Sequence, residues 1–450
     1  MAPSPANQPG LLWRQLPKLL RARRLVLLAF AVFAYLVLSQ RPRAQWRPPS
    51  SGAAATRSGD LAAVANDTLG FDKVFAINRP SRSDRRDSLS LAAALTGVRL
   101  SYSDGIDGSE VEERVLPADS EGKRIRKGNV GSWRAHMNVL RTIVEEGLET
   151  ALILEDDIDW DVRLKSQLQT FSLASQAFLQ PLDGHSHGRS LSALLRDEGD
   201  ATTTLPRIPQ LPHQPQGSPY GTGWDVLWLG HCGTELPIHE GEEDAKNPHR
   251  DADADAPPPP PPAQKKPLGG VVVTIRDDET VPAPRHLRPH PFADRPDRLA
   301  TAHPPRTRAV HASRATTCSL GYAVSRAGAR RLLWRLGVDT LTAGFDLMLR
   351  DLCDGRYHGD GEGGVEGGGR EAGQWRGRGR PVCVTVQPPL FSHFSSGRGD
   401  AGSDIQGVGG GYMQRSGSQY IRLSVKQNLG RLVEGASVEE LVDQWPDDRL

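Results

Sequence analysis

Three consecutive acidic residues, Glu155, Asp156 and Asp157, directly follow the apolar run 151–154. An apolar run of this length is typical of a buried strand in a parallel sheet, which is covered on both faces. Ligands of such sheets bind beyond the carboxyl ends of the strands, so the acids stand where a site is expected. Adjacent carboxylates repel one another unless a cation or a proton relieves them. The sequence therefore favours a divalent metal, with a solvated turn or a helix N-cap as the alternative.

The segment before this strand predicts a helix. Ser132 is placed as its N-cap, and Trp133, His136 and Leu140 share one helical face. Gly147 is placed to end the helix as a residue with left-handed backbone. A helix that enters a buried strand ending in acids is half of an α/β nucleotide-binding unit.

A basic turn follows another expected strand, 73–77, which ends at Asn78. Arg82 and Arg85 stand at the start of the next helix, where guanidinium groups can donate to phosphate oxygens. The alternative is that these arginines only solvate the first helical turn. A second short strand is expected next, and Asp104 beyond it could reach the hydroxyl groups of a ribose.

Three stretches of the chain together resemble glycosyltransferase family 25. They are 73–78 with Arg82, Asp84, Arg85 and Arg86, then 128–136, then 151–157. The family includes bacterial lipooligosaccharide galactosyltransferases and animal procollagen galactosyltransferases, and the nearest resemblance is to its fungal members. It implies a GT-A-like α/β fold, in which helices flank a Rossmann-like mixed sheet.

The resemblance also implies an activity. A hexose, most simply galactose, would pass with inversion from a UDP-sugar to a hydroxyl group of a glycan or glycoprotein. A manganese ion would be held by the acidic motif. Two rivals remain open: a non-catalytic lumenal sugar-binding relative, and a metal-dependent phosphohydrolase, whose aspartate-first strand motif is missing.

The resemblance assigns residues to each role. The metal ligands would be Asp157, Glu155 and His393, since in GT-A enzymes a histidine often completes the metal shell near the diphosphate. A surface or packed histidine is the alternative. The residues expected to contact the donor are Asn78, Arg82, Arg85, Asp104, His136, Glu155 and Asp156.

An inverting transferase needs a base on the acceptor side of the donor. Asp346 is the candidate, because it is the only acid in the apolar stretch 345–349 and a buried acid needs a partner or a task. The alternative is an N-cap for a helix that begins there.

An uncharged, largely apolar run over 25–39 follows several arginines. Its length of about 22 Å is short of the ~30 Å core of an average bilayer. We expect an uncleaved signal anchor of the ER or Golgi membrane, with 1–24 cytoplasmic by the positive-inside rule; a cleaved signal peptide is the rival. A flexible stem over 40–70 would carry a glycosylation sequon at Asn66.

The lumenal domain is expected over 71–450, interrupted by insertions near 181–222, 234–316 and 355–380. The 47 glycines and 35 prolines of the chain favour such insertions, while a net charge of +1 gives no reason to expect a nucleic-acid partner. Four cysteines permit three pairings. We predict Cys232 with Cys318 and Cys353 with Cys383, because each pair would close one insertion.

Overall fold

The computed structural model describes residues 62–117, 125–179, 202–204, 218–237, 272–287, 297–356, 380–395 and 416–447, with only the backbone for 202–204. The expected cytoplasmic tail 1–24, anchor 25–39 and most of the stem lie outside the described residues. Among the helices that are described, none is long and apolar enough to cross a membrane.

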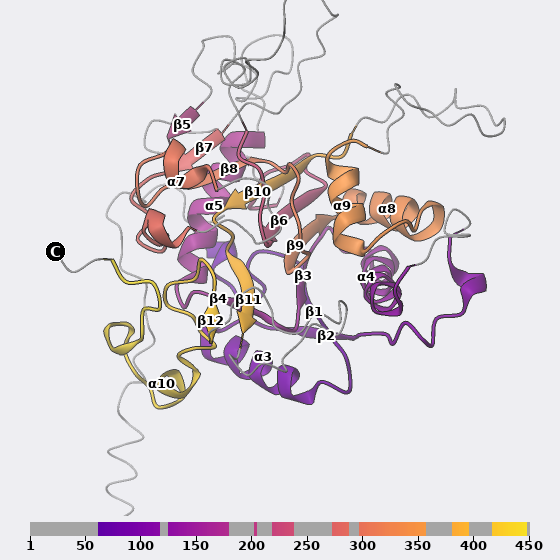
Figure 1. Cartoon of the computed structure of the whole chain (residues 1–450), viewed down its shortest axis with the longest axis horizontal. Coiled ribbons are helices and arrows are strands. Elements are labelled where there is room, and N and C mark those ends of the chain that lie inside the picture. The colour runs from indigo at the N-terminus through magenta and orange to yellow at the C-terminus, as the bar shows by residue number, and fades with distance from the viewer. Residues whose placement is uncertain are drawn as a thin grey trace, which may run out of the picture. The chain divides into compact units, whose positions relative to one another are not determined.

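A twelve-stranded mixed sheet organises the described residues (Figure 1). Its main path runs in the order β2-β1-β3-β9-β6-β10-β8-β7-β5, and β11 pairs outside this path with β4, β6 and β12. Neighbours β2, β1 and β3 are parallel, whereas β9 is antiparallel to both β3 and β6. The strands are β1 Lys73–Asn78, β2 Ser101–Asp104, β3 Thr150–Glu155, β4 Ile158–Trp160, β5 Thr202–Thr204, β6 Val226–Gly230, β7 Val272–Ile275, β8 Arg308–Ala312, β9 Gly321–Ser325, β10 Cys383–Gln387, β11 Phe391–Ser395 and β12 Gly417–Ser418.

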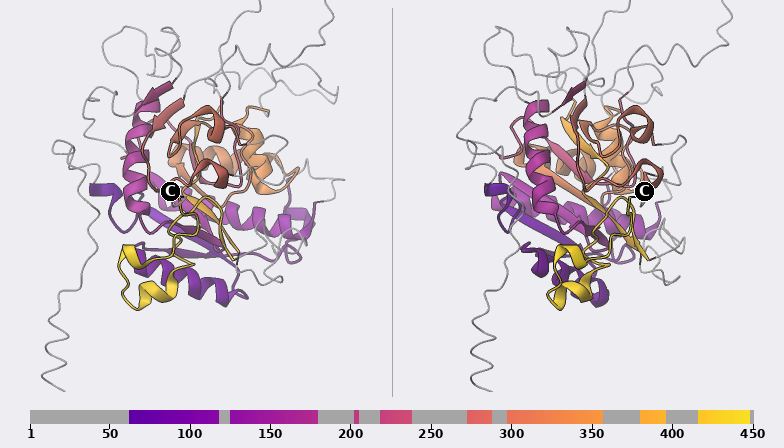
Figure 2. Two further views of the ribbon diagram at one scale, coloured as in Figure 1. Left: turned by 60° about the vertical axis from the view of Figure 1, so that its left-hand side comes forward. Right: turned by 90° about the vertical axis from the view of Figure 1, so that its left-hand side faces the viewer.

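Helices cover both faces of this sheet. The helices are α3 Ser83–Thr96, α4 Lys127–Glu146, α5 Leu164–Leu179, α7 Leu299–Ala302, α8 Arg326–Leu332 with a π-helical continuation Leu333–Asp339, α9 Phe345–Cys353 and α10 Leu429–Val433. Short 3-10 turns are Glu113–Val115, Pro284–His286 and Val438–Glu440. In both views of Figure 2, α10 (yellow) lies beside α3 (indigo), although the two helices are far apart in the sequence. The result is a mixed α/β fold, as expected.

Alternate residues of β3 enter two different cores. Ala151 and Ile153 pack with side chains of α4, α8 and α9. Leu152 and Leu154 pack on the other face with side chains of α3 and α5. The apolar run is therefore continuous because both faces of the strand are covered, which is the reason its sequence does not alternate.

Helix α4 begins earlier than the sequence predicts. Its first residue is Lys127, so Ser132 lies inside the helix and the N-cap prediction was wrong. Gly147 ends the helix with a φ of 68°, as predicted. The early start is possible because Gly131 lacks a side chain: a Cβ there would lie 2.4 Å from the Ile106 carbonyl oxygen. Close packing against this loop outweighs the local capping signal.

The folded region is larger than the expected boundaries allow. Val64 and Leu69, placed in the stem by the sequence, are fully buried in the core. The expected insertion 234–316 supplies β7 and β8 to the sheet. The sequence of β7, Val-Val-Thr-Ile, consists of β-branched residues and is typical of a strand. It was assigned to an insertion because it follows a polyproline run.

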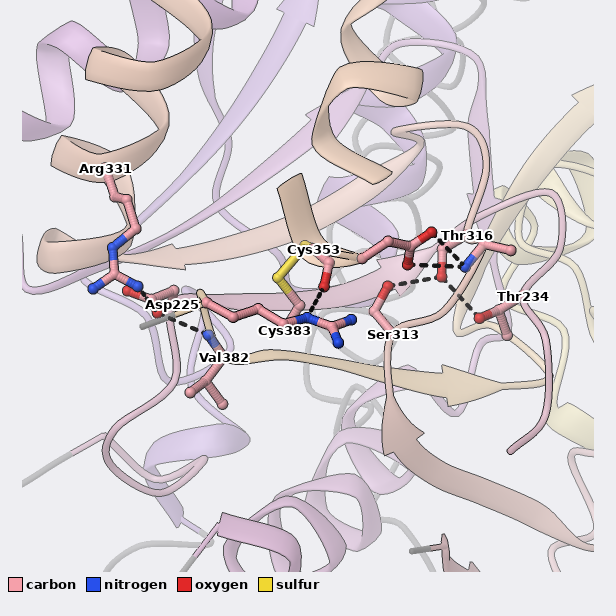
Figure 3. Close-up of a disulfide and its surroundings, with 11 residues drawn as sticks. Asp225, Thr234, Ser313, Thr316, Arg331, Cys353, Val382 and Cys383 are labelled. Carbon is pink, nitrogen blue, oxygen red and sulfur yellow. Dashed lines mark hydrogen bonds and ion pairs between the residues drawn. A yellow bond between two sulfur atoms is a disulfide. The ribbon is translucent and has the colours of Figure 1, made fainter. Parts of the chain in front are cut away.

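Both disulfides have the expected pairing. Cys232 and Cys318 join the segments after β6 and before β9, with Cα atoms 5.4 Å apart. Cys353 and Cys383 join the end of α9 to the start of β10, with Cα atoms 5.7 Å apart (Figure 3). Both pairs therefore hold the sheet to segments that lead into the expected insertions.

The close approach at Gly131 predicts a destabilising substitution. In Gly131→Ala the new methyl group meets backbone, so we expect the free energy of unfolding to fall by about 1–3 kcal/mol. Gly430→Ala in α10 is the matched control, because a Cβ at Gly430 has no neighbour within 4 Å. Chemical denaturation of both variants measures this, and equal stability of the two would contradict the packing argument.

Candidate active site

The carboxyl ends of β1 and β3 bring Asn78 and Asp156 together. Ile77 pairs in register with Glu155, so the next residue of each strand lies at the same edge of the sheet. The Asn78 amide donates to the Asp156 carboxylate at 2.8 Å and to the Arg82 carbonyl at 3.1 Å. The side-chain oxygen of Asn78, Oδ1, is buried without a partner among the described residues. That oxygen is available to a donor group of a ligand.

Arg85, in the first turn of α3, connects the two aspartates. One guanidinium nitrogen donates to Asp156 at 2.7 Å and to Asp157 at 3.1 Å. His393 on β11 contacts the same Asp157 oxygen as Arg85, with Nε2 3.2 Å from Oδ2. This contact exists because β11 is antiparallel to β4, which puts His393 opposite Ile158, one residue beyond the acids.

The two aspartates have different electrostatic environments. Burial by itself would raise the pKa of Asp157, but the charges of His393, Arg85 and Lys426 outweigh it and hold that pKa below its ordinary value. Burial and the charge of Asp157 raise the pKa of Asp156, against the lowering effects of Arg85 and Asn78. Asp157 is therefore the carboxylate that stays ionised, and Asp156 is the easier one to protonate.

Lys426 is a member of the site that the sequence did not reveal. Its buried ammonium group donates to the Asp156 carbonyl oxygen at 3.2 Å. Burial lowers the pKa of Lys426, and the charges of Asp159, Asp157 and Asp156 act against that shift. No local pattern marks this lysine, because 270 residues separate it from Asp156.

Asp159 fixes the segment that carries Lys426. Its fully buried carboxylate accepts from the Lys426 backbone at 3.0 Å and from the hydroxyl groups of Ser418, at 2.5 Å, and Ser424. Asp161, two residues later, also binds this segment, because its carboxylate accepts from the Leu423 backbone at 3.0 Å. Acids at alternate positions of the strand are a signal in the sequence that could have identified this role.

Glu155 points toward a different set of groups. Its carboxylate accepts from the Ser319 hydroxyl at 2.7 Å, and Nε2 of His136 lies 3.7 Å away. His136 is buried, stacked on Phe345 at 4.1 Å, and its Nδ1 lies 3.0 Å from the Tyr322 hydroxyl. His136 thus supports Glu155 from inside the protein.

Asp346 lies within the first turn of α9 and does not cap it, because the N-cap is Gly344. Its carboxylate instead accepts from the Cys318 backbone at 3.0 Å. Burial, and to a lesser degree the charge of Glu155, raises the pKa of Asp346. A buried carboxylate with a raised pKa near another acid is a candidate proton acceptor.

Two expected donor contacts lie at the rim. Arg82 binds both carboxylate oxygens of Asp84 at 2.9 Å, and this hydrogen bonding lowers the pKa of Asp84 to about 2. Asp104 is exposed at the end of β2, paired in register with Asn78. Asp104 therefore reaches the same edge of the sheet as the buried acids.

The expected metal ligands are only partly assembled. In the part of the chain that is described, no three His, Cys, Asp or Glu side chains lie together in an arrangement that could hold a metal ion. Asp157 and His393 are in contact, whereas Glu155 is engaged with Ser319. Oδ1 of Asp157 is buried without a partner among the described residues. The structure therefore brings together two of the three expected ligands, Asp157 and His393, and engages Glu155 elsewhere.

Part of the chain, about a quarter of its length, is similar in sequence to known proteins. Procollagen galactosyltransferase 1 of Danio rerio is 34% identical over 128 residues, which cover 26% of this chain and 21% of that protein. Procollagen galactosyltransferase 1-B of Xenopus laevis is 29% identical over 115 residues, covering 23% and 19%. The human protein named inactive glycosyltransferase 25 family member 3 is 28% identical over 114 residues, covering 22% and 19%. No protein-family model matches the chain.

The chain spans about a fifth of the length of these relatives in the matched stretches. The similarity supports a glycosyltransferase of the family 25 type, and several of the relatives are named as inactive or probably inactive. The three relatives are vertebrate proteins, so they give no support to the fungal resemblance expected from the sequence.

The pairing of His393 with Asp157 predicts a pH dependence of stability. Burial would lower the pKa of His393, but Asp157 outweighs it and raises that pKa. The stabilisation is therefore complete below the unfolded pKa of about 6.5 and is lost as the pH rises through the folded pKa. We expect the free energy of unfolding to differ more between wild type and His393→Gln at pH 6 than at pH 9. Repeating the comparison in Asp157→Asn should abolish this dependence, and a difference that grows with pH would contradict the pairing.

Proposed function

We propose that the chain is a glycosyltransferase that transfers galactose from UDP-galactose, with inversion, to a hydroxyl group of a glycan or glycoprotein. The observation that carries this proposal is the pair of aspartates that directly follows the carboxyl end of β3, beside the end of the parallel strand β1, with Arg85 and His393 in contact with them. The names of the similar proteins suggest the sugar. The acceptor class follows from the same names and rests on them alone.

The donor would lie along the edge formed by β1, β2 and β3. Arg85 is placed to contact the diphosphate if its bond to Asp157 is released, and the exposed Asp104 is placed for the ribose. Asn78 offers its buried carbonyl oxygen. Arg82 and Asp156 complete this set, whereas Glu155 would face the sugar with His136 acting through it.

A divalent ion would be held by Asp157 and His393, with oxygens of the diphosphate completing its shell. Such an ion, when bound, stabilises negative charge on the departing UDP. The chain itself supplies further positive charge at this position through Arg85 and Lys426, which surround the same two aspartates. Once Arg85 has exchanged its bond to Asp157 for the diphosphate, both cations would stabilise negative charge on the leaving group.

Asp346 is our candidate for the base. Its buried carboxylate, whose pKa is raised, would accept the proton of the acceptor hydroxyl as that oxygen attacks the sugar. Its position near Glu155 is consistent with the acceptor side of the donor.

We place the domain in the lumen of the ER or Golgi, anchored through 25–39. Two disulfides suit an oxidising compartment. The Asn66 side chain is exposed, as a glycosylation acceptor must be, although its carbonyl oxygen accepts from the Thr68 and Gly70 backbone.

A non-catalytic, sugar-binding role is the second candidate. It is favoured by Arg85, which engages both aspartates, and by the relatives named as inactive. Incubation with UDP-galactose and manganese separates the two, since only the enzyme releases UDP.

Asp157→Asn tests the metal site. The substitution removes the charge of the carboxylate that is held ionised, so UDP release should fall at least about a hundredfold. Asp87→Asn, at an exposed position of α3, is the control and should keep wild-type activity. Full activity of Asp157→Asn would exclude Asp157 as a metal ligand.

Asp346→Asn tests the base. We expect kcat to fall by about 10²–10⁴ while the dissociation constant of the donor is unchanged, because general-base catalysis contributes on that scale. Steady-state kinetics with a UDP titration would show this, with the melting temperature as the check on folding. Normal turnover in this variant would make Asp346 structural.

A further inference from the structure

A second pocket lies at the opposite end of the strands from the aspartates. Its volume is about 530 Å³, and its walls include the residues that precede β6 and β10 and the end of β9. Register places it there: Ser325, the last residue of β9, pairs with Thr150, the first residue of β3. The pocket is therefore distinct from the proposed donor site, which lies at the other end of β3.

Arginine side chains dominate this pocket. Guanidinium groups exceed carboxylates by two, because the charged lining residues are Arg326, Arg330, Arg331, Arg380, Glu149 and Asp225. The excess is local, since the whole chain carries a net charge of only +1. An anionic ligand would be attracted to the pocket by these local arginines. The small net charge of the whole chain would add little to that attraction.

Two of the arginines build the walls. Arg331 pairs with Asp225 at 2.8 Å, and Asp225 also accepts from the Val382 backbone at 2.9 Å (Figure 3). Arg326 pairs with Glu149. These contacts join α8 to the start of β6 and to the segments before β3 and β10. They fix the shape of the pocket and use both of its carboxylates.

The other two arginines keep donors for a ligand. Arg330 is exposed, and among the described residues it has no ion pair or hydrogen bond. Arg380 donates from Nε to the Cys353 carbonyl oxygen at 2.5 Å. The two terminal nitrogens of its guanidinium group take no part in that bond and can donate to a ligand. Guanidinium groups recognise sulfate and carboxylate through paired hydrogen bonds.

An exposed tryptophan stands next to Arg330. Trp334 follows four residues later on α8 and its π-helical continuation, so the two side chains share one face of the helix. Its side chain is 59% exposed, which is unusual for a tryptophan in a folded protein. A flat aromatic face beside an anion-binding group can hold the apolar face of a sugar ring.

We propose that this pocket binds an acidic saccharide, meaning a sugar that carries sulfate or carboxylate groups. Arg330 and Arg380 bind the anionic groups, and Trp334 lies against a ring that extends out of the pocket. The volume suits a small ligand such as one or two sugar residues. This binding site does not depend on the proposed transferase activity.

The test is a calorimetric titration of the full chain with a fully sulfated heparin disaccharide. We expect saturable binding that weakens as salt is raised. Arg330→Gln and Trp334→Ala should each weaken it at least about tenfold, the scale of a lost charge-assisted contact. Arg431→Gln, at an exposed arginine of α10, is the matched control and should bind like wild type. UDP release by Arg330→Gln should equal that of the wild type, which keeps this result separate from the proposed function.

Four results would overturn the proposal. The first is absence of binding by the folded wild-type chain at millimolar disaccharide, and the second is equal binding by Arg330→Gln. The third is equal affinity for inorganic sulfate, which would reduce the pocket to a simple anion site. A single-stranded oligonucleotide that competes at lower concentration through the same arginine would assign the pocket to nucleic acid instead.

Discussion

Two adjacent carboxylates with little access to solvent are stable only where cations surround them, and this constraint shapes the structure around Asp156 and Asp157. Arg85 comes from α3, His393 from β11 and Lys426 from the C-terminal segment. The cluster therefore requires three distant parts of the chain to meet at the end of β3. Removing one of these cations would weaken the compensation of the negative charge, and that loss adds to the cost of the missing contact itself.

The C-terminal segment reaches this cluster because Asp159 and Asp161 bind it. Their buried carboxylates accept from the backbone and side chains of 418–426. The strand that presents the acidic motif thus continues directly into the strand that binds the last part of the fold. Acidic residues have two separate tasks within seven positions: Glu155 to Asp157 face the site, and the next two acids at alternate positions bind the C-terminal segment.

Most local features of the fold followed from the sequence. The apolar run 151–154 lies within β3 and the helix ends at Gly147, as predicted, because each depends on residues close to an element boundary. The disulfide pairs, 86 and 30 residues apart, were predicted because each closes an expected insertion. The start of α4 was missed because it depends on contact between Gly131 and the loop at Ile106, which precedes the helix. Of the candidate site, Asn78, Arg85, Asp156, Asp157 and His393 are in contact with one another. Lys426 could not be predicted, since its role exists only after the C-terminal segment has docked.

The central claim is that this charged cluster binds a UDP-sugar donor. The most direct measurement is calorimetric titration of the wild-type chain with UDP, in the presence and absence of manganese. The account predicts saturable binding that tightens with manganese, because the ion would join Asp157 and His393 to the diphosphate. Failure of the folded chain to bind UDP under either condition would contradict the account.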